Sequence, residues 1–303
     1  MTSGLRKTAA LLALAVMFTG CSAPAESESG AALPDVVGSM DIRYAEQFSV
    51  DYLADGSALA EVADGRRYLI IPDGGEVPEQ LPEDVTVISQ PENIYLASSS
   101  SMDLFSSLDC LGDILASSTP ESGWKLPEIA QAMADEDILY AGKYSSPDIE
   151  LLMSEGCDLA IENMMIYHSP KTAEQIESCG IPVFIERSSA ESHPLGRLEW
   201  VRLYGLMLGK SDEAEKFFSE KCSLLDEVTS RESTGCTAAF FYISSNGSAV
   251  VRKPGDYISK MIELAGGKYV FTAGDLNVDE NALSSANIQF LSLIHISEPT
   301  RLR

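Results

Sequence analysis

The segment DILYAGKYSSPDIELLMSEGCDLAIENMMIYHSPKTAEQIESCGIPVFIE, residues 137–186, alternates two kinds of pattern. Short apolar runs typical of buried strands (DILYAG, CDLAIE, IPVFIE) are separated by amphipathic runs that begin with Ser, Pro or Asp, as helices do, and the last of these ends at Gly180. Two more strand-like runs, NIYLA and DILA, precede the segment. Because strands that alternate with helices form parallel, doubly wound sheets, the segment predicts an α/β fold with ligands bound at the carboxyl ends of the strands.

The chain on either side adds a meander, a helical connection and a second lobe. Residues 47–71 carry Asp55-Gly56 and Asp64-Gly65 between apolar runs, which predicts a three-stranded β-meander. Residues 198–231 have a continuous helical pattern, and residues 235–290 restart the alternation of strand and helix. Because a complete lobe takes about 100 residues, the second lobe is expected to lack roughly 40 to 70.

We therefore expect an α/β protein with two doubly wound, Rossmann-like lobes joined by a long rigid helix, a small N-terminal β-meander and an incomplete second lobe. The expected divisions are a signal peptide (1–20), a flexible tether (21–40), the meander and its connection (41–90), the N-terminal lobe (91–193), the interlobe helix region (194–232), the start of the C-terminal lobe (233–290) and a non-native tail (291–303).

The N-terminus has the pattern of a bacterial lipoprotein signal. Arg6 and Lys7 precede an apolar core, residues 9–18, that is shorter than the about 20 residues of a membrane-spanning helix. The following FTGC, residues 18–21, resembles a lipobox, so Cys21 is predicted to carry the two acyl chains that anchor the body outside the cell. The alternative is a secreted protein that is cut nearby, with Cys21 incidental. Residues 22–40, rich in Ser, Ala, Glu and Pro, predict a flexible spacer.

The C-terminal tail is anomalous. LSLIHISEPTR, residues 291–301, back-translates without a mismatch into a sequence that resembles a transposon-end adapter used in sequencing libraries. We expect residues 291–303 to be an artefact, with native sequence ending near Phe290; the alternative is a genuine amphipathic terminus. No function is inferred from His295 or Arg301.

Composition and motifs exclude several classes of function. A net charge of -25 repels phosphate backbones, so nucleic acid is not an expected partner. The five cysteines after Cys21 form no CxxC pair, which argues against a disulfide framework or a zinc site. The chain has no GxSxG, GxGxxG or phosphate-loop motif, and His168 and His193 have no evident nucleophile beside them. We predict no catalytic residue, no metal site and no cofactor.

Two long blocks carry a resemblance to a known family. ILYAGKYSSPDIELLMSEGCDLAIENMMIYHSP (138–170) and GIPVFIERSSAESHPLGRLEWVRLYGLMLGKSDEAEKFF (180–218) resemble the substrate-binding lipoproteins of ABC importers, in the class III periplasmic-binding-protein group that handles iron complexes, and the resemblance extends over about residues 41–290. It implies a monomer that captures an iron complex, most simply a ferric siderophore, between two lobes and delivers it to a permease and its ATPase. Cobalamin or haem is the alternative ligand, and an extracytoplasmic α/β enzyme is the alternative from another class.

The resemblance also implies site residues. Asp103, in the helix after the first strand of the lobe, is the candidate acid for docking to the permease; the alternative is an ordinary first-turn acid that favours the helix dipole. Aromatic and Met side chains suit a flat organic ligand, and cations pair with carboxylates or catecholates. The candidate ligand contacts are Lys143, Tyr144, Met165, Tyr167, His168, Arg187, His193 and Arg197 from the first lobe and connection, and Tyr242, Arg252 and Tyr257 from the second.

Each group of candidates has a structural alternative. Arg197, Glu199 and Trp200 would cap and pack the connecting helix, and His168 and His193 would be hydrogen-bonded loop histidines. Tyr167 and His168 are also residue types that ligate haem iron, although adjacent residues do not readily face one metal together.

Overall fold

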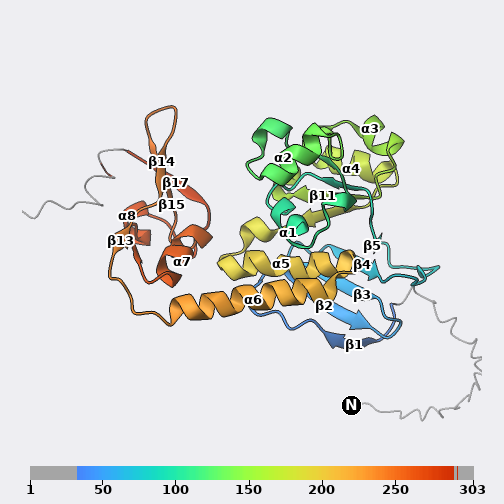
Figure 1. Cartoon of the computed structure of the whole chain (residues 1–303), viewed down its shortest axis with the longest axis horizontal. Helices are drawn as coiled ribbons and strands as arrows, with labels where there is room; N and C mark the ends of the chain where they lie inside the picture. Colours follow the sequence, from blue (N-terminus) through green and yellow to red (C-terminus); the bar gives the residue numbers. More distant parts are fainter. Residues whose placement is uncertain (1–32, 290–291, 293–303) are drawn as a thin grey trace, which may run out of the picture.

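The computed structural model describes residues 33–289 and residue 292. The predicted signal peptide and Cys21 lie outside the described residues, as does all of the predicted tail except Ser292. Within the described ranges, no helix combines the length and the apolar character needed to cross a membrane. Figure 1 shows a larger body followed by a smaller lobe, with one long helix running between them.

The N-terminal sheet has five strands in the order β1-β2-β3-β4-β5. They are β1 Val36–Ser39, β2 Phe48–Leu53, β3 Ala58–Val62, β4 Arg67–Ile71 and β5 Val85–Ser89. The predicted meander is confirmed, because β2, β3 and β4 pair antiparallel and Gly56 and Gly65 take positive φ angles of 89° and 86° in the two hairpins. β5 pairs parallel with β4.

The tether prediction is wrong for its last residues. Val36–Ser39 forms β1, which pairs antiparallel with β2. Two β-branched valines favour the extended chain, and the Ser39 hydroxyl donates a 2.6 Å hydrogen bond to the carboxylate of Asp51 on β2.

The second sheet confirms the doubly wound lobe. Its strands lie in the order β12-β11-β6-β7-β8, and every neighbouring pair is parallel. The order reverses at β6, which makes the carboxyl edge beside β6 and β11 the topological switch point. The elements are β6 Ile94–Leu96, α1 Met102–Ser107, η1 Leu111–Asp113, β7 Ile114–Ser117, η2 Glu121–Gly123, α2 Pro127–Ala134, β8 Leu139–Tyr140, β9 Gly142–Lys143, β10 Ser146–Pro147, α3 Ile149–Ser154, β11 Leu159–Asn163, η3 Met164–His168, α4 Pro170–Ser178, β12 Val183–Glu186 and η4 Ser188–Ala190.

The connecting region differs from the predicted single helix. It consists of α5 Pro194–Met207 and α6 Ser211–Thr229, which lie side by side as a hairpin (Figure 1). The break falls at Gly209, whose φ of 67° no helix interior accepts. The two helices pack closely because Gly205 has no side chain: a Cβ there would lie 2.4 Å from the Cβ of Ala214.

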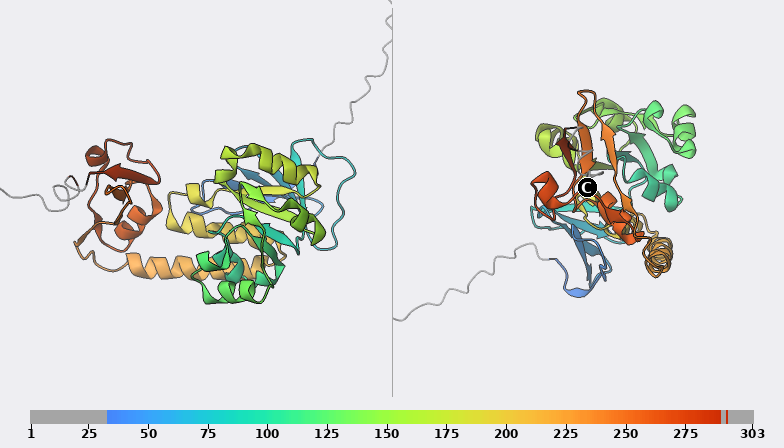
Figure 2. Two further views of the ribbon diagram at one scale, coloured as in Figure 1. Left: turned by 90° about the horizontal axis from the view of Figure 1, so that it is seen from above. Right: turned by 90° about the vertical axis from the view of Figure 1, so that its left-hand side faces the viewer.

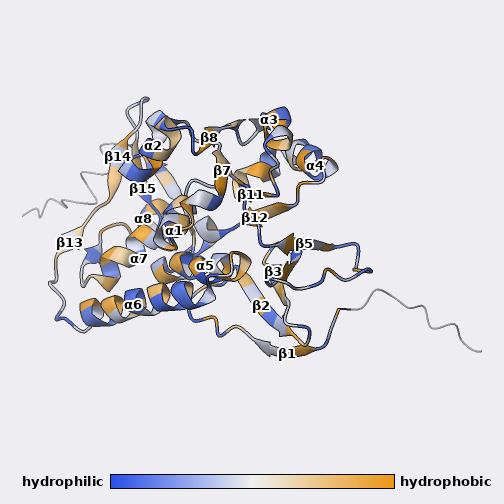
Figure 3. Cartoon of the chain, turned by 45° about the vertical axis from the view of Figure 1, so that its right-hand side comes forward, coloured by the Kyte–Doolittle hydropathy of each residue, from blue (hydrophilic) through white to orange (hydrophobic). Residues whose placement is uncertain are grey.

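Helix α5 joins the two sheets into one core. Trp200 is fully buried, and its ring meets Phe48 of β2 at 5.0 Å and Phe184 of β12 at 6.2 Å between centroids. Helix α6 buries only the stripe Ala214, Phe218 and Cys222, and both hydrophilic and hydrophobic residues line it in Figure 3. Seen from above in Figure 2, α6 reaches from the larger body to the smaller lobe, so α6 is the interlobe helix.

The smaller lobe, residues 233–289, contains two short sheets. β13 Thr237–Ala238 and β16 Lys268–Tyr269 are parallel across α7 Tyr257–Leu264, as the alternation predicts. β14 Phe241–Ile243, β15 Ala249–Arg252 and β17 Ser285–Ile288 are antiparallel, and α8 spans Ala273–Leu276. The antiparallel part departs from the predicted doubly wound lobe because Asn246-Gly247, with Gly247 at a φ of 81°, closes a hairpin.

Candidate functional site

Three loops meet at the carboxyl edge of neighbouring strands. A run of serines, residues 98–101, follows β6; η3 follows β11; and η4 follows β12. Together they enclose a cavity of about 270 Å³, which we call the strand-end pocket. Its lining residues are Ser98, Ser99, Ser100, Asn163, Met164, Met165, Glu186 and Ser189. This is the switch point where doubly wound sheets bind their ligands.

A second cavity, of about 540 Å³, lies between the larger body and α7 of the smaller lobe; we call it the interlobe pocket. It is lined by Ser100, Asp103, Leu104, Ser188, Pro194, Leu195, Arg197, Leu198, Tyr257 and Met261. Ser100 lines both cavities, and Ser188 in one is followed by Ser189 in the other. The two pockets are therefore neighbours, and we call them together the cleft.

Arg197 is the cation of the interlobe pocket. Its guanidinium carbon lies 4.0 Å from the centroid of the Tyr257 ring, in cation–π geometry across the two lobes. Among residues 33–289, the Arg197 side chain forms no ion pair and no hydrogen bond, and its cation–π contact with Tyr257 is its polar contact there. Its donors are thus available to an anionic group in the cleft.

Glu186 forms the polar floor of the strand-end pocket. It is fully buried at the end of β12, and its two oxygens accept hydrogen bonds from the Ser98 hydroxyl (2.5 Å), the Ser100 hydroxyl (3.2 Å) and the Ser188 N–H (2.8 Å). Glu186 belongs to the strand-end loop ERSSAESHPLGR, which was expected to supply ligand contacts, whereas these serines were not among the predicted site residues. The signal that pointed to them is the run SSSS directly after the strand NIYLA.

Four predicted residues line the cleft. Arg197 and Tyr257 meet in the interlobe pocket, Met165 lies half-exposed in the strand-end pocket, and Asp103 lies exposed in the first turn of α1 at the rim of the interlobe pocket. Their roles as ligand or permease contacts remain predictions.

Tyr167 and Arg187 contact the meander instead. The Tyr167 hydroxyl donates to the carboxylate of Asp64 in the β3–β4 hairpin and accepts from Arg187 at 3.3 Å, while Arg187 also donates to Gln47 at 3.2 Å. These contacts hold η3, and with it the wall of the strand-end pocket, against the N-terminal sheet.

His193 caps α5 rather than facing either pocket of the cleft. Its Nδ1 accepts from the Leu195 N–H at 3.1 Å, and its ring stacks on Tyr44 with centroids 4.7 Å apart. Burial lowers the pKa of His193, which favours the neutral ring that this cap requires. His193 also lines a separate surface cavity with Lys260 and Glu263.

The remaining candidates lie outside both pockets. Arg252 is 3.7 Å from the carboxylate of Asp256, and Tyr242 is exposed on β14. Lys143 and His168 are exposed, and Tyr144 packs partly against the core of the first lobe. No group of three His, Cys, Asp or Glu side chains suited to a metal ion occurs among the described residues.

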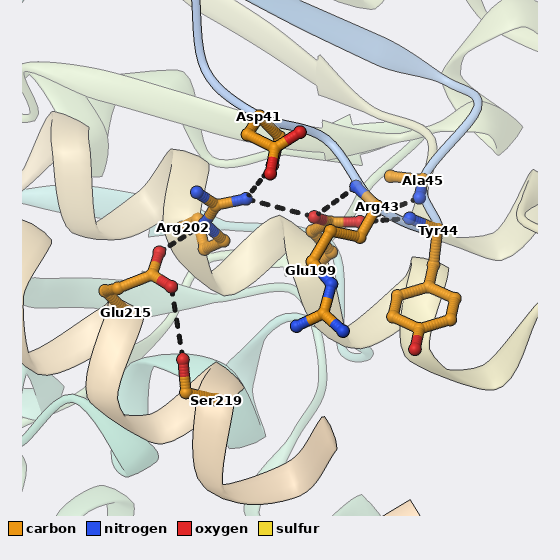
Figure 4. Close-up of polar contacts among 8 residues, drawn as sticks. All are labelled: Asp41, Arg43, Tyr44, Ala45, Glu199, Arg202, Glu215 and Ser219. Atoms are coloured by element: carbon orange, nitrogen blue, oxygen red, sulfur yellow. Dashed lines mark hydrogen bonds and ion pairs between the residues drawn. The ribbon is translucent and has the colours of Figure 1, made fainter. Parts of the chain in front are cut away.

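Two buried carboxylates explain how the chain before β2 is held. Glu199 accepts from the N–H groups of Arg43 (2.9 Å), Tyr44 (2.7 Å) and Ala45 (2.8 Å), and from Arg202 at 3.1 Å (Figure 4). Glu191 likewise accepts hydrogen bonds from the N–H groups of Glu46 (2.8 Å) and Gln47 (3.1 Å) and from the indole N–H of Trp200 (2.9 Å). Residues 43–47 are therefore fixed to α5 through Glu199 and to the loop before α5 through Glu191.

This architecture is an α/β fold that the chain shares with solved periplasmic binding proteins. No family model matches the chain. It is similar to an uncharacterized lipoprotein of Methanocaldococcus jannaschii, with 24% identity over 247 residues. The match covers 75% of this chain and 56% of that protein, so the chain spans about half the length of this curated relative.

Several solved structures are similar to this chain in fold. A periplasmic haem-binding protein of Vibrio cholerae superposes with a TM-score of 0.55 at 15% identity, over 67% of this chain and 72% of that one. The petrobactin-binding protein of Bacillus subtilis gives 0.54 at 12% identity, over 77% and 72%. A periplasmic catecholate-siderophore binding protein of Vibrio cholerae gives 0.53 at 12% identity, over 68% and 69%.

Proposed function

We propose that this chain is the extracytoplasmic, lipid-anchored solute-binding component of an ABC importer, and that it binds an iron complex, a ferric siderophore, between its two lobes. The observation that carries the proposal is Arg197, stacked on Tyr257 in the interlobe pocket of about 540 Å³ and without an ion pair among residues 33–289. A guanidinium beside an aromatic ring and Met261 suits an anionic chelate with flat organic arms.

The similarities support the same function. Solved structures with this fold are named for haem, petrobactin and catecholate siderophores. The curated relative is named a lipoprotein, which agrees with acylation of Cys21. The ligand is handed on to a permease, for which Asp103 at the rim of the cleft supplies an exposed acid.

Thermal unfolding with a panel of ligands tests the binding. The panel contains ferric catecholate, hydroxamate and citrate complexes, haemin and cyanocobalamin. A ligand at a hundred times its Kd adds about 2.7 kcal/mol to the unfolding free energy, which raises the Tm by about 5–10 °C for a chain of this size. A shift with haemin or cyanocobalamin alone would replace the siderophore by that ligand, and no shift with any of them would exclude the proposed function.

Arg197→Met tests the site. It keeps an unbranched apolar stem but removes the donors, and loss of a hydrogen bond between charged groups weakens binding about 10- to 100-fold. Lys143→Met is the matched control because Lys143 is an exposed cation outside both pockets. Equal weakening by the two variants would show that general charge, rather than the interlobe pocket, holds the ligand.

Anchoring is tested separately. Metabolic labelling with a palmitate analogue is expected to mark the wild-type chain and to fail with Cys21→Ala. Label that persists in the variant would contradict acylation at Cys21.

A further inference from the structure

We infer that the cleft accepts one negatively charged group and disfavours a second, so that its ligand is a monoanionic complex rather than a trianionic one. The inference rests on the proposed function for the identity of the whole ligand, but the charge that the cleft accepts follows from the side chains that line it. A single guanidinium, that of Arg197, lines the cleft together with two carboxylates, those of Asp103 and Glu186.

Arg197 is the only cation that lines either pocket in the part of the chain that the structure describes. Apart from the two carboxylates, the other lining side chains are hydroxyls, an amide, thioethers, a phenol and hydrocarbons. Such neutral polar groups can donate or accept hydrogen bonds, but they bring no charge that would balance a second or third anion. The donors of Arg197 can therefore take one anionic group of the ligand, and no further cation of the cleft remains for another.

The two carboxylates oppose a further anion. Asp103, exposed in the first turn of α1, lines the same pocket as Arg197 without forming an ion pair among residues 33–289. Glu186, at the floor of the strand-end pocket, accepts from two serine hydroxyls and one backbone N–H, all of them neutral donors. Because no cation is paired with either carboxylate there, a second negative group would meet repulsion in both pockets.

Other cations close to the cleft residues in the sequence are engaged elsewhere. Arg187 donates to Gln47 and to a tyrosine hydroxyl on η3, against the N-terminal sheet. In the smaller lobe, Arg252 and Lys260 lie 3.7 Å and 3.1 Å from carboxylates of their own segment. None of these three cations lines either pocket. Turning one of them toward a ligand would break these contacts, so the cleft keeps a single available cation.

The charge distinguishes between classes of iron complex. Three catecholates leave a ferric complex with three negative charges, whereas three hydroxamates leave it neutral. A ferric trihydroxamate that carries one carboxylate matches the cleft, since the carboxylate can pair with Arg197 while the neutral remainder lies against Tyr257 and Met261. A ferric tricatecholate would bring three negative charges to one cation.

Four flat probes test the charge without an iron complex. Benzamide is neutral, benzoate and monomethyl terephthalate carry one negative charge, and terephthalate carries two. With 13C-methyl methionine labelling, the Met261 signal reports binding in the interlobe pocket at low salt. We expect benzoate to bind about tenfold more tightly than benzamide, the effect of a hydrogen bond between charged groups. Terephthalate should bind about fivefold more weakly than its monomethyl ester, which is of similar size but lacks the second charge.

Three results with the wild-type chain would overturn the inference. They are equal binding of benzamide and benzoate, binding of terephthalate as tightly as its monomethyl ester or more tightly, and the absence of a saturable Met261 shift with benzoate.

Charge variants assign the effect to the cleft. Arg197→Met should abolish the preference for benzoate over benzamide, and Lys143→Met, the exposed control, should keep it. Asp103→Asn should reduce the fivefold discrimination against terephthalate to about twofold, whereas Glu174→Gln, which removes an exposed acid on α4, should leave it unchanged. A preference that survives Arg197→Met, or a discrimination that Asp103→Asn leaves unchanged or that both acid variants lower equally, would contradict selection by the cleft.

A second arm uses iron complexes. The monoanionic complex is a ferric trihydroxamate whose free amine has been succinylated, and the trianionic one is a ferric tricatecholate. We expect the monoanionic complex to bind at least tenfold more tightly. If the probe order holds while no iron complex binds the wild-type chain, the proposed function fails and the inference about the cleft stands. If the tricatecholate binds as tightly as the monoanionic complex or more tightly, the inference fails and the function stands.

Discussion

Glu162 gives the sharpest prediction about stability. It lies on β11 with no exposed surface, and neither of its oxygens has a hydrogen-bond partner among the described residues. The nearby Tyr95 hydroxyl is also without a partner there. Burial raises the pKa of Glu162 from 4.5 to about 8, because the ionised form would lose its hydration without compensation.

The sign and size of the effect follow from linkage. Between about pH 4.5 and pH 8 the folded chain retains a proton that the unfolded chain has lost, so the unfolding free energy falls as the pH rises through this window. At 1.36 kcal/mol per pKa unit, the difference between 4.5 and about 8 amounts to about 5 kcal/mol. Domains have unfolding free energies of about 5–15 kcal/mol, so the loss is large.

The pH-dependent loss of unfolding free energy is measured by urea unfolding of the wild type and of Glu162→Gln, followed by circular dichroism from about pH 5 to pH 9. The Gln variant is neutral at every pH, so the wild type should lose about 4 kcal/mol relative to it between pH 5 and pH 9, with the loss levelling off above about pH 8. Glu174→Gln, at an exposed position on α4, is the control and should follow the wild-type curve. Parallel curves for the wild type and Glu162→Gln would refute the reasoning.

Three further predictions concern packing and capping. Glu199→Ala leaves three backbone N–H groups without their acceptor and should lower the unfolding free energy measured in urea by about 3–5 kcal/mol. A loss under 1 kcal/mol would contradict the role of Glu199 in holding residues 43–45. Gly205→Ala places a Cβ 2.4 Å from that of Ala214 and should cost about 1–3 kcal/mol, while Gly112→Ala, with open space around it, should be nearly neutral. His193 has a lowered pKa, so its stabilising cap should be lost as the pH falls below 6.5, and His193→Asn, which keeps an acceptor, should remove that pH dependence of the urea midpoint.

Local sequence chemistry predicted most of the larger body. The Asp-Gly pairs predicted the meander, and the alternation of strand and helix from residue 94 predicted the parallel sheet. Both signals are local, since each depends on residues within one or two neighbouring elements. Residues 198–231 were predicted as one continuous helix, although the acids after Ser211 favour a helix start there and Gly209 is an ordinary stop signal. The apolar periodicity on both sides of the break masked them.

The site was only partly predictable. Arg197 and Tyr257 were each expected to face a ligand, but their contact depends on how α7 packs beside α5, which no sequence spacing determines. Tyr167 and Arg187 were expected in the same site, and Asp64, 103 residues before Tyr167, binds the tyrosine instead. Long-range partners of this kind appear only when the fold has brought the two segments together.

The direct test of capture between the lobes is methyl NMR with a paramagnetic cargo. The chain, labelled with 13C-methyl methionine, is titrated with the ferric siderophore that gives the largest thermal shift and with its diamagnetic gallium analogue. The ferric complex should broaden Met164, Met165 and Met261, which line the cleft, and leave the exposed Met153 on α3 sharp, while the gallium complex should shift the same three signals without broadening them. Broadening centred on Met153, or no selective broadening with a ligand that binds, would contradict an iron complex held between the lobes.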